Sequence, residues 1–281
     1  MTSSHLPLPV SPEHLEFEAL GTVCQLYSVG RDGQSLAEGA TWVLELHRRL
    51  TRFDPSSELS AFNSSTGAWV RVSATLEDLL REALYAHELS GGLVHAGVLH
   101  ALLAAGYTHS FSEGARPTPR STVILDPLPP LGDILAVAPG AAKLRPGFGI
   151  DLGGIAKGWL ADRLAERLGE NCVVNLGGDL FARGIGPEGE GWPIGFGGTT
   201  IYLRDQGAAT SGTFKRSWGP DLHHLVDPRT GRPAKSNLKE VSVIAASGTD
   251  AEIYAKTALL LGRQSAEFYL EQHCPGWWLS P

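Results

Sequence analysis

The strongest chemical signal in the sequence is a glycine-rich turn with opposite charges on its two sides. Asp151 stands just before Gly153-Gly154, and Lys157 stands just after them, where a helical pattern begins. Glycines ahead of a helix leave backbone N–H groups open to a ligand, which is a common way for proteins to hold phosphate. The same glycines also suit a tight turn into a packed helix. The turn alone slightly favours a structural role over a phosphate site, so other segments must decide between these two interpretations.

A second signal is a pair of histidines followed by an acidic turn. His224 lies shortly before Asp227, and two such side chains can face one pocket as acid, base or metal ligand. The segment Asp227–Gly231 also makes a good turn by itself. Neighbouring residues of a strand point in opposite directions, so we expect only one of His223 and His224 to face a site. The spacing therefore favours a chemical role of these residues and a purely structural turn equally.

A third signal is the hydroxyl-rich end of an expected strand. Thr210 and Ser211, followed by Gly212, offer donors to phosphate or carbonyl oxygens. This is also a very common way to end a strand, and the spacing alone favours the structural interpretation.

A fourth signal lies at the start of the last strong helical pattern. Asp250 and Glu252 suit a hard cation there, or simply complement the helix dipole. Glu252 and Lys256 are also spaced for an ordinary helix salt bridge, with the charges in the favourable order. Taken alone, this segment favours the structural interpretation.

Composition excludes several classes of protein. Of the 281 residues, 42% are hydrophobic and 19% charged, with a net charge of -7, so we expect a soluble globular protein and not a general nucleic-acid binder. We expect no signal peptide and no membrane insertion, since no apolar stretch is long enough. Cys24, Cys172 and Cys274 are odd in number and lack any Cys-x-x-Cys spacing, which favours free thiols and a cytoplasmic location.

Common catalytic motifs are missing from the sequence. It contains no Gly-x-Ser-x-Gly elbow, no phosphate-binding Walker loop and no His-Glu-x-x-His zinc motif. Its glycines also do not fit the Gly-x-Gly-x-x-Gly spacing of a dinucleotide-binding fold.

The elements that must position these residues indicate an α+β fold in one large domain. A loose lead-in at residues 1–16 precedes a strand or hairpin at 17–29, and an irregular proline-rich connection is expected at about 110–131. Apolar periodicity predicts helices and strands in the remaining segments. We expect helices at 34–50, 76–89, 98–105, 155–168, 251–261 and 266–272, and strands at 172–174, 181–185, 192–196, 200–203, 208–211 and 241–246.

Taken in order, these segments resemble the ApbE family of FAD:protein FMN transferases. Asp151–Gly158 looks like its central motif and Asn175–Asp179 like the next one. The similarity continues through Thr210–Gly212 and His224–Gly231 to Ala251–Gly262, and covers nearly the whole chain from Phe17. It implies a mixed or antiparallel sheet with packed helices and an FAD cleft.

The resemblance also implies an activity. Members of the family split FAD with magnesium and transfer FMN to a threonine hydroxyl of an acceptor protein, releasing AMP. By similarity, His224 is the candidate base, with Asp227 beside it in the catalytic set. The metal ligands are the Gly154 carbonyl and the side chains at positions 252 and 256. The residues expected to contact FAD are Leu20, Phe53, Leu93, Val94, His95, Asp151, Lys157, Thr210, Ser211 and Val226.

The sequence departs from the family pattern around the metal. Glu252 and Lys256 replace the usual aspartate and threonine, and a protonated lysine cannot ligate a metal. His95-Ala96-Gly97 replaces Asp-Pro-Thr, and Leu20 replaces a methionine. The alternative is therefore an FAD-binding protein or FAD pyrophosphatase with an altered or absent magnesium site. If Asp151 contacts the nucleotide, Asp151→Ala should weaken FAD binding and leave the stability of the apo-protein nearly unchanged.

Overall fold

A seven-stranded sheet forms the centre of the molecule. The computed structural model describes residues 11–65, 67–110, 127–196, 198–214, 216–219 and 222–281. Every neighbouring pair of strands in the sheet is antiparallel, which confirms the expected α+β class in its antiparallel form. In spatial order the strands are β1 (Glu13–Ala19), β2 (Thr22–Ser28), β6 (Cys172–Leu176), β7 (Leu180–Arg183), β10 (Gln206–Gly212), β15 (Glu240–Ala245) and β16 (Gly276–Ser280).

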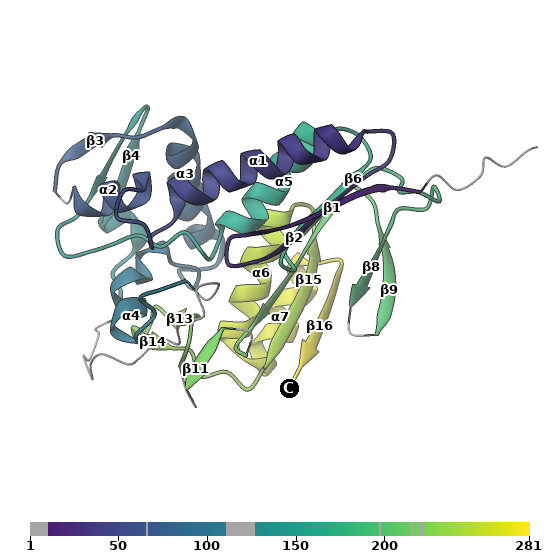
Figure 1. Ribbon diagram of the computed structural model, residues 1–281. Coiled ribbons are helices and arrows are strands. Elements are labelled where there is room, and N and C mark those ends of the chain that lie inside the picture. The colour runs from purple at the N-terminus through teal and green to yellow at the C-terminus, as the bar shows by residue number, and fades with distance from the viewer. Residues whose placement is uncertain (1–10, 66, 111–126, 197, 215, 220–221) are drawn as a thin grey trace, which may run out of the picture.

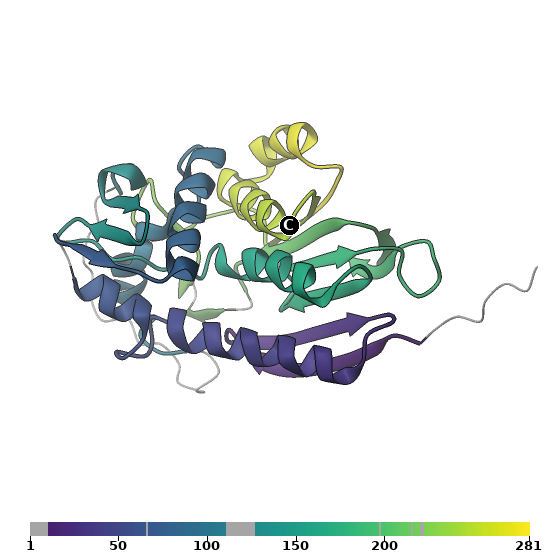
Figure 2. The same ribbon diagram turned by 90° about the horizontal axis from the view of Figure 1, so that it is seen from above.

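Three helices cover one face of this sheet in the same order as the strands beneath them. They are α1 (Gly33–Leu50), α5 (Ala156–Leu168) and α6 (Gly248–Leu261), and the view from above shows α5 between the other two (Figure 2). A fourth helix, α7 (Arg263–His273), packs on α6. The apolar faces of the helices meet the sheet in a fully buried core that includes Val43, Leu164 and Leu26. Because α5 and α6 pack on the sheet, the first residues of α5 and the whole of α6 are held in fixed positions relative to it.

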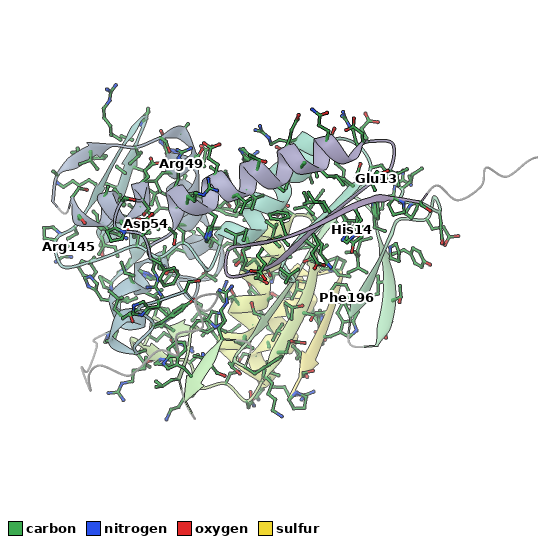
Figure 3. All side chains as sticks on the ribbon, viewed as in Figure 1. Glu13, His14, Arg49, Asp54, Arg145 and Phe196 are labelled. Carbon is green, nitrogen blue, oxygen red and sulfur yellow. The ribbon has the colours of Figure 1, made fainter. Side chains whose placement is uncertain are left out.

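The opposite face of the sheet is covered by a hairpin, β8 (Trp192–Phe196) and β9 (Thr199–Leu203), which stands at the edge of the molecule in Figure 1. Trp192 and Phe196 are buried against this face, and the Phe196 ring, labelled in Figure 3, stacks on Trp278 with centroids 5.0 Å apart. Strand β6 is therefore buried on both sides, which explains why its sequence is a continuous apolar run.

A mainly helical lobe lies beside the sheet. Its helices are α2 (Glu58–Ser64), α3 (Ala74–Leu89), α4 (Leu99–Ala104) and the single turns η1 (Ala96–Val98) and η3 (Leu131–Asp133). It also contains a three-stranded sheet that the sequence did not predict, in the order β3 (Trp69–Arg71), β5 (Ala141–Leu144) and β4 (Leu135–Ala138). Two short ladders follow β10: β11 (Ser217–Gly219) pairs with β12 (Leu222–His223), and β13 (Val226–Asp227) pairs with β14 (Arg232–Pro233).

Side-chain contacts hold the loop between α1 and α2 in place. Arg49, labelled at the end of α1 in Figure 3, lies 2.9 Å from the Glu58 carboxylate, which also accepts a bond from the Ser73 amide. Asp54 accepts bonds from the amide and hydroxyl of Ser56, and the Ser57 side chain caps α2 by accepting the Ser60 amide. The loop therefore presents the residues between Thr51 and Asp54 in one fixed arrangement.

The chain departs from the sequence expectations at its start. Strand β1 begins at Glu13, inside the segment expected to be a loose lead-in through residue 16, because Glu13 to Glu16 pair with β2. Most of the proline-rich connection at about 110–131 lies outside the described residues. Within the described part of the chain, no helix is both long and apolar enough to span a bilayer.

Candidate functional site

A cavity of about 360 Å³ opens at the end of the sheet where β2 begins and β6 and β10 end. Its volume is typical of ligand pockets. The hairpin turn of β1 and β2, the loop after α1, the start of α5 and the middle of α6 all contribute to its wall. The residues expected in the site line this cavity, with the exception of Asp227: they are Leu20, Phe53, Leu93, Val94, His95, Asp151, Gly154, Lys157, Thr210, Ser211, His224, Val226, Glu252 and Lys256.

Asp227 lies outside the cavity lining because the turn that follows it uses its carboxylate. Both of its oxygens accept bonds from the Arg229 guanidinium at 2.8 and 2.9 Å, and one also accepts the Arg229 amide. Its backbone carbonyl accepts the amide of Gly231. The structure thus places Asp227 in a turn and not among the groups that face the cavity, contrary to its expected place in the catalytic set.

Asp151 is bound by a cation that the sequence analysis missed. The Arg52 Nε lies 2.6 Å from Asp151 Oδ2, and the Arg52 side chain is only 5% exposed. The guanidinium lies over the rings of Phe53 and Tyr107, 4.2 and 4.5 Å from their centroids. Within the described part of the chain, the buried Nη2 of Arg52 makes no hydrogen bond, so it can donate to a ligand in the cavity.

The glycine turn is closed by its own aspartate. Asp151 Oδ1 accepts the Gly153 amide at 2.9 Å, and the Asp151 amide donates to the carbonyl of Ala96. The Gly153 N–H expected to face phosphate is therefore bonded within the turn. The cations that line the cavity, Arg52, Lys157, Arg216 and Lys256, remain to offer positive charge to a ligand.

Lys157, at the start of α5, pairs with the buried carboxylate of Asp179. Its ammonium also lies 3.9 Å from Glu252 Oε1. Asp179 follows Gly177-Gly178, where positive φ angles turn the chain sharply from β6 into β7. The turn at Gly177-Gly178 thus positions a carboxylate in the wall of the cavity.

The three groups expected to ligate magnesium do lie together, but the cation among them is an ammonium. Lys256 Nζ donates to the Gly154 carbonyl at 2.5 Å and to Glu252 Oε1 at 3.3 Å. The other oxygen of Glu252 accepts the Gly158 amide at 2.8 Å. Burial acts to raise the pKa of Glu252. The Lys256 and Lys157 ammonium groups, with the bond from the Gly158 amide, lower it by more than burial raises it, so the pKa of Glu252 lies below its ordinary value.

These groups do not fit a magnesium ion. An ion at the Gly154 carbonyl would have to displace the Lys256 ammonium, and Lys157 would repel it from nearby. Among the residues that the structure describes, no cluster of three or more His, Cys, Asp or Glu side chains is placed to hold a metal. Asp250, the other carboxylate of this segment, instead accepts the hydroxyl of Tyr85 at 3.2 Å.

His224 is the histidine of the pair that faces the cavity, as expected. His223 is buried, with one ring nitrogen on the Ala234 carbonyl and the other accepting the Leu225 amide. His224 Nδ1 has no hydrogen-bond partner within the described residues. Burial, followed by the charges of Arg216, Lys256 and Lys157, holds the pKa of His224 well below its ordinary value. The imidazole is therefore neutral at pH 7.

The remaining wall of the cavity is largely apolar. Leu93, Val94 and Val226 are buried there. His95 belongs to this wall as a neutral ring, because its Nδ1 accepts the Gly97 amide and its Nε2 donates to the Pro129 carbonyl. Burial also lowers the pKa of His95. On the opposite side, Thr210 and Ser211 end β10, where the Thr210 hydroxyl bonds that of Ser242.

Leu20 forms a strained corner of the cavity. It adopts a φ of 56° in the β1–β2 turn, a left-handed conformation that β-carbon sterics disfavour. Its amide donates to His47 Nδ1, and its carbonyl accepts Arg216 Nη2, both at 3.2 Å. Strained backbone of this kind concentrates at functional sites. Arg216 is thereby held at the cavity wall, a placement that nothing in the sequence around it signalled.

Comparisons with known proteins identify one family. The chain matches the ApbE family model over residues 20–277. The FAD:protein FMN transferase of Treponema pallidum (strain Nichols) is 28% identical over 286 residues, covering 88% of this chain and 78% of that protein. The one from Haemophilus influenzae (strain ATCC 51907 / DSM 11121 / KW20 / Rd) is 26% identical over 247 residues, covering 79% and 71%.

Solved structures share the fold. The crystal structure of the ApbE protein from Thermotoga maritima matches with a TM-score of 0.83 at 24% identity, covering 96% of this chain and 94% of that one. The flavin transferase ApbE from Vibrio cholerae matches with a TM-score of 0.77 at 22% identity, covering 97% and 98%.

Proposed function

The chain belongs to the ApbE family, and we propose that it is an FAD:protein FMN transferase that attaches FMN to a threonine of an acceptor protein. The observation that carries this proposal is that cationic side chains and apolar side chains line the same cavity. Among the residues that the structure describes, four cations (Arg52, Lys157, Arg216 and Lys256) and three carboxylates (Asp151, Asp179 and Glu252) line it. A surplus of positive charge suits a pyrophosphate, and the apolar wall suits flat rings.

His224 is the proposed base of the reaction. Its neutral imidazole takes the proton of the acceptor hydroxyl as the threonine oxygen bonds to the phosphorus of the FMN half. The bond from that phosphorus to the bridging oxygen breaks, and AMP leaves with that oxygen. Binding of the FAD phosphates brings negative charge beside Arg216, Lys157 and Lys256, which offsets their effect on His224 and raises its pKa toward a useful value.

The cations of the cavity hold the phosphates during this step. Arg216 and Arg52 present guanidinium groups, whose planar donors match phosphate oxygens. No step is assigned to magnesium, because the Lys256 ammonium already holds the Gly154 carbonyl expected to ligate it.

We also propose that the protein works in the cytoplasm on a protein partner. Support comes from its three free cysteines, of which Cys24 and Cys172 are buried. Burial raises the pKa of Cys24 to about 11 and that of Cys172 to about 12, so these thiols are unreactive at neutral pH.

The test is a transfer assay. Purified protein is mixed with FAD and an acceptor protein already known to be flavinylated by a curated relative. AMP release is followed by chromatography, and flavin fluorescence is read from the acceptor band on a denaturing gel. We expect both signals with the wild-type acceptor and neither when its target threonine is replaced by alanine. AMP release without acceptor would instead identify an FAD pyrophosphatase, and FAD binding without AMP would identify an FAD-binding protein.

A further inference from the structure

The contact between Lys256 and the glycine turn places a fixed positive charge inside the cavity. The Lys256 ammonium bonds the Gly154 carbonyl at 2.5 Å and Glu252 Oε1 at 3.3 Å, and the Lys256 side chain is 13% exposed. It comes from the middle of α6, one helical turn beyond Glu252, so its stem runs along the helix toward the turn before α5. The β-carbon that any other residue would carry at position 154 lies 3.4 Å from Lys256 Nζ. The turn and the lysine are thus packed together.

Glu252 is fixed in the orientation that receives this ammonium. Its side chain is 2% exposed, Oε2 accepts the Gly158 amide at 2.8 Å, and Oε1 faces both lysines. Helices α5 and α6 are in backbone contact at this level, since a β-carbon at Gly158 would lie 2.4 Å from the Gly248 carbonyl oxygen. The Gly158 amide and the two ammonium groups thus hold the carboxylate in this orientation.

Charge balance favours the same conclusion. Lys256 and Lys157 already balance the two buried carboxylates of this region, Glu252 and Asp179. A divalent ion added here would lie beside two ammonium groups, whereas an ammonium in its place completes one buried pair. A divalent ion would therefore add two positive charges that no carboxylate among these groups offsets.

We propose that Lys256 is a built-in cation that takes the place of the divalent metal, so that this chain binds the FAD pyrophosphate without metal. The part of the proposal that concerns FAD rests on the proposed function. The part that concerns metal stands on the apo-protein alone. The corollary is that removal of the ammonium creates a metal site, because Lys256→Thr leaves a hydroxyl, the Glu252 carboxylate and the Gly154 carbonyl around one space.

The first arm measures metal binding by the apo-protein. Mn²⁺ is titrated into metal-free protein, and the free ion is read from its electron paramagnetic resonance spectrum. We expect wild-type protein to leave the signal of the free ion unchanged and Lys256→Thr to reduce it with a stoichiometry near one. The matched control is Lys235→Thr, an exposed lysine away from the cavity lining, which should behave as wild type. Stoichiometric Mn²⁺ binding by wild-type protein would overturn the proposal.

The second arm measures FAD binding by quenching of flavin fluorescence, in EDTA and in millimolar Mg²⁺. We expect the same wild-type affinity in both buffers. Lys256→Thr should bind at least about tenfold more weakly in EDTA and recover with Mg²⁺. If the FAD affinity of wild-type protein is about tenfold or more weaker in EDTA than in Mg²⁺, the proposal is contradicted. This outcome does not depend on whether any variant folds. Absence of FAD binding in every buffer would reject the proposed function, and the Mn²⁺ arm would still decide the role of Lys256.

Discussion

Arg52 and Asp151 form a buried ion pair whose guanidinium lies over the ring of Phe53. This pair joins the loop after α1 to the turn before α5, so one contact serves both the fold and the cavity. Because of this pair, we no longer expect Asp151→Ala to leave the stability of the apo-protein nearly unchanged. Removal of the carboxylate leaves a buried arginine without its partner, a loss far larger than that of a surface pair.

We therefore predict that Asp151→Ala destabilises the apo-protein by about 3 kcal/mol in addition to weakening FAD binding. Urea unfolding followed by tryptophan fluorescence measures the first effect, and a flavin titration measures the second. A double variant, Arg52→Met with Asp151→Ala, should recover part of the lost stability because no unpaired charge remains. If Asp151→Ala leaves the unfolding midpoint unchanged, the pair is not a structural contact in solution.

A second prediction concerns the proposed base. His224→Gln should reduce AMP release about 100- to 10,000-fold, the usual contribution of a general base. FAD affinity should change little, since glutamine is neutral as the imidazole is. Transfer assays and flavin titrations on the same preparation separate the two effects. Equal loss of binding and turnover would show that His224 holds the substrate and does not act as the base.

The pH dependence of the reaction gives a third prediction. His224 must be neutral to accept a proton, so the rate should fall as the pH drops through its pKa. In the free protein that pKa is held well below its ordinary value by burial and by neighbouring cations. In the FAD complex the phosphates raise it, so kcat should begin to fall at a higher pH than kcat/KM. Coincident profiles would mean that the bound phosphates do not act on His224.

The same histidine should also affect stability. The unfolded chain protonates it below a pKa of about 6.5, while the folded protein does not. The unfolded state therefore binds more protons as the pH falls, and the folded state loses up to about 1.4 kcal/mol per pH unit from this one group. His224→Gln should unfold with a shallower dependence on pH between about 6.5 and 5. Urea unfolding at several pH values tests this, and identical slopes would contradict it.

The contact between α5 and α6 gives a fifth prediction. Gly158→Ala places a β-carbon 2.4 Å from the Gly248 carbonyl oxygen, and backbone on both sides leaves no flexible atom to move. Overpacking should outweigh the better helix propensity of alanine and cost about 1–2 kcal/mol. The control is Gly132→Ala, where an added β-carbon meets no atom within 4 Å. FAD affinity should fall for Gly158→Ala alone, since the Gly158 amide fixes Glu252.

Most elements could be predicted from the sequence because they carry long or regular apolar patterns. Helix α6 has an apolar run with a serine cap and a glycine end, and β8 and β10 lie between glycines. The β3–β5–β4 sheet was missed because its strands have three or four residues and consist partly of alanine, which has no preference for strands. Strand β16 was missed because it stands alone at the end of the chain and gains its pattern only by pairing with β15.

The site was predictable as a set of positions and not as a set of contacts. The family motifs led to residues that do share one cavity, yet the bond from Lys256 to Gly154 and the pair of Arg52 with Asp151 join segments distant in the sequence. The position of Arg52 directly before Phe53, a residue expected to contact FAD, was the feature of the sequence that could have indicated a cation in the site. The place of Asp227 could not be predicted because its spacing suits a turn as well as a site, and the structure shows its carboxylate bonded to Arg229 within a turn.

The bond from Arg216 to the Leu20 carbonyl spans 196 positions of the chain. Contacts of such sequence separation carry a large loop-closure entropy, so we expect this bond to form after the strands of the central sheet have paired. A growing or truncated chain that lacks the segment around Arg216 therefore has no closed cavity, however well its N-terminal half has folded. Nucleotide binding is thus a reporter of completed folding, and in a refolding experiment flavin quenching should lag behind the recovery of secondary structure.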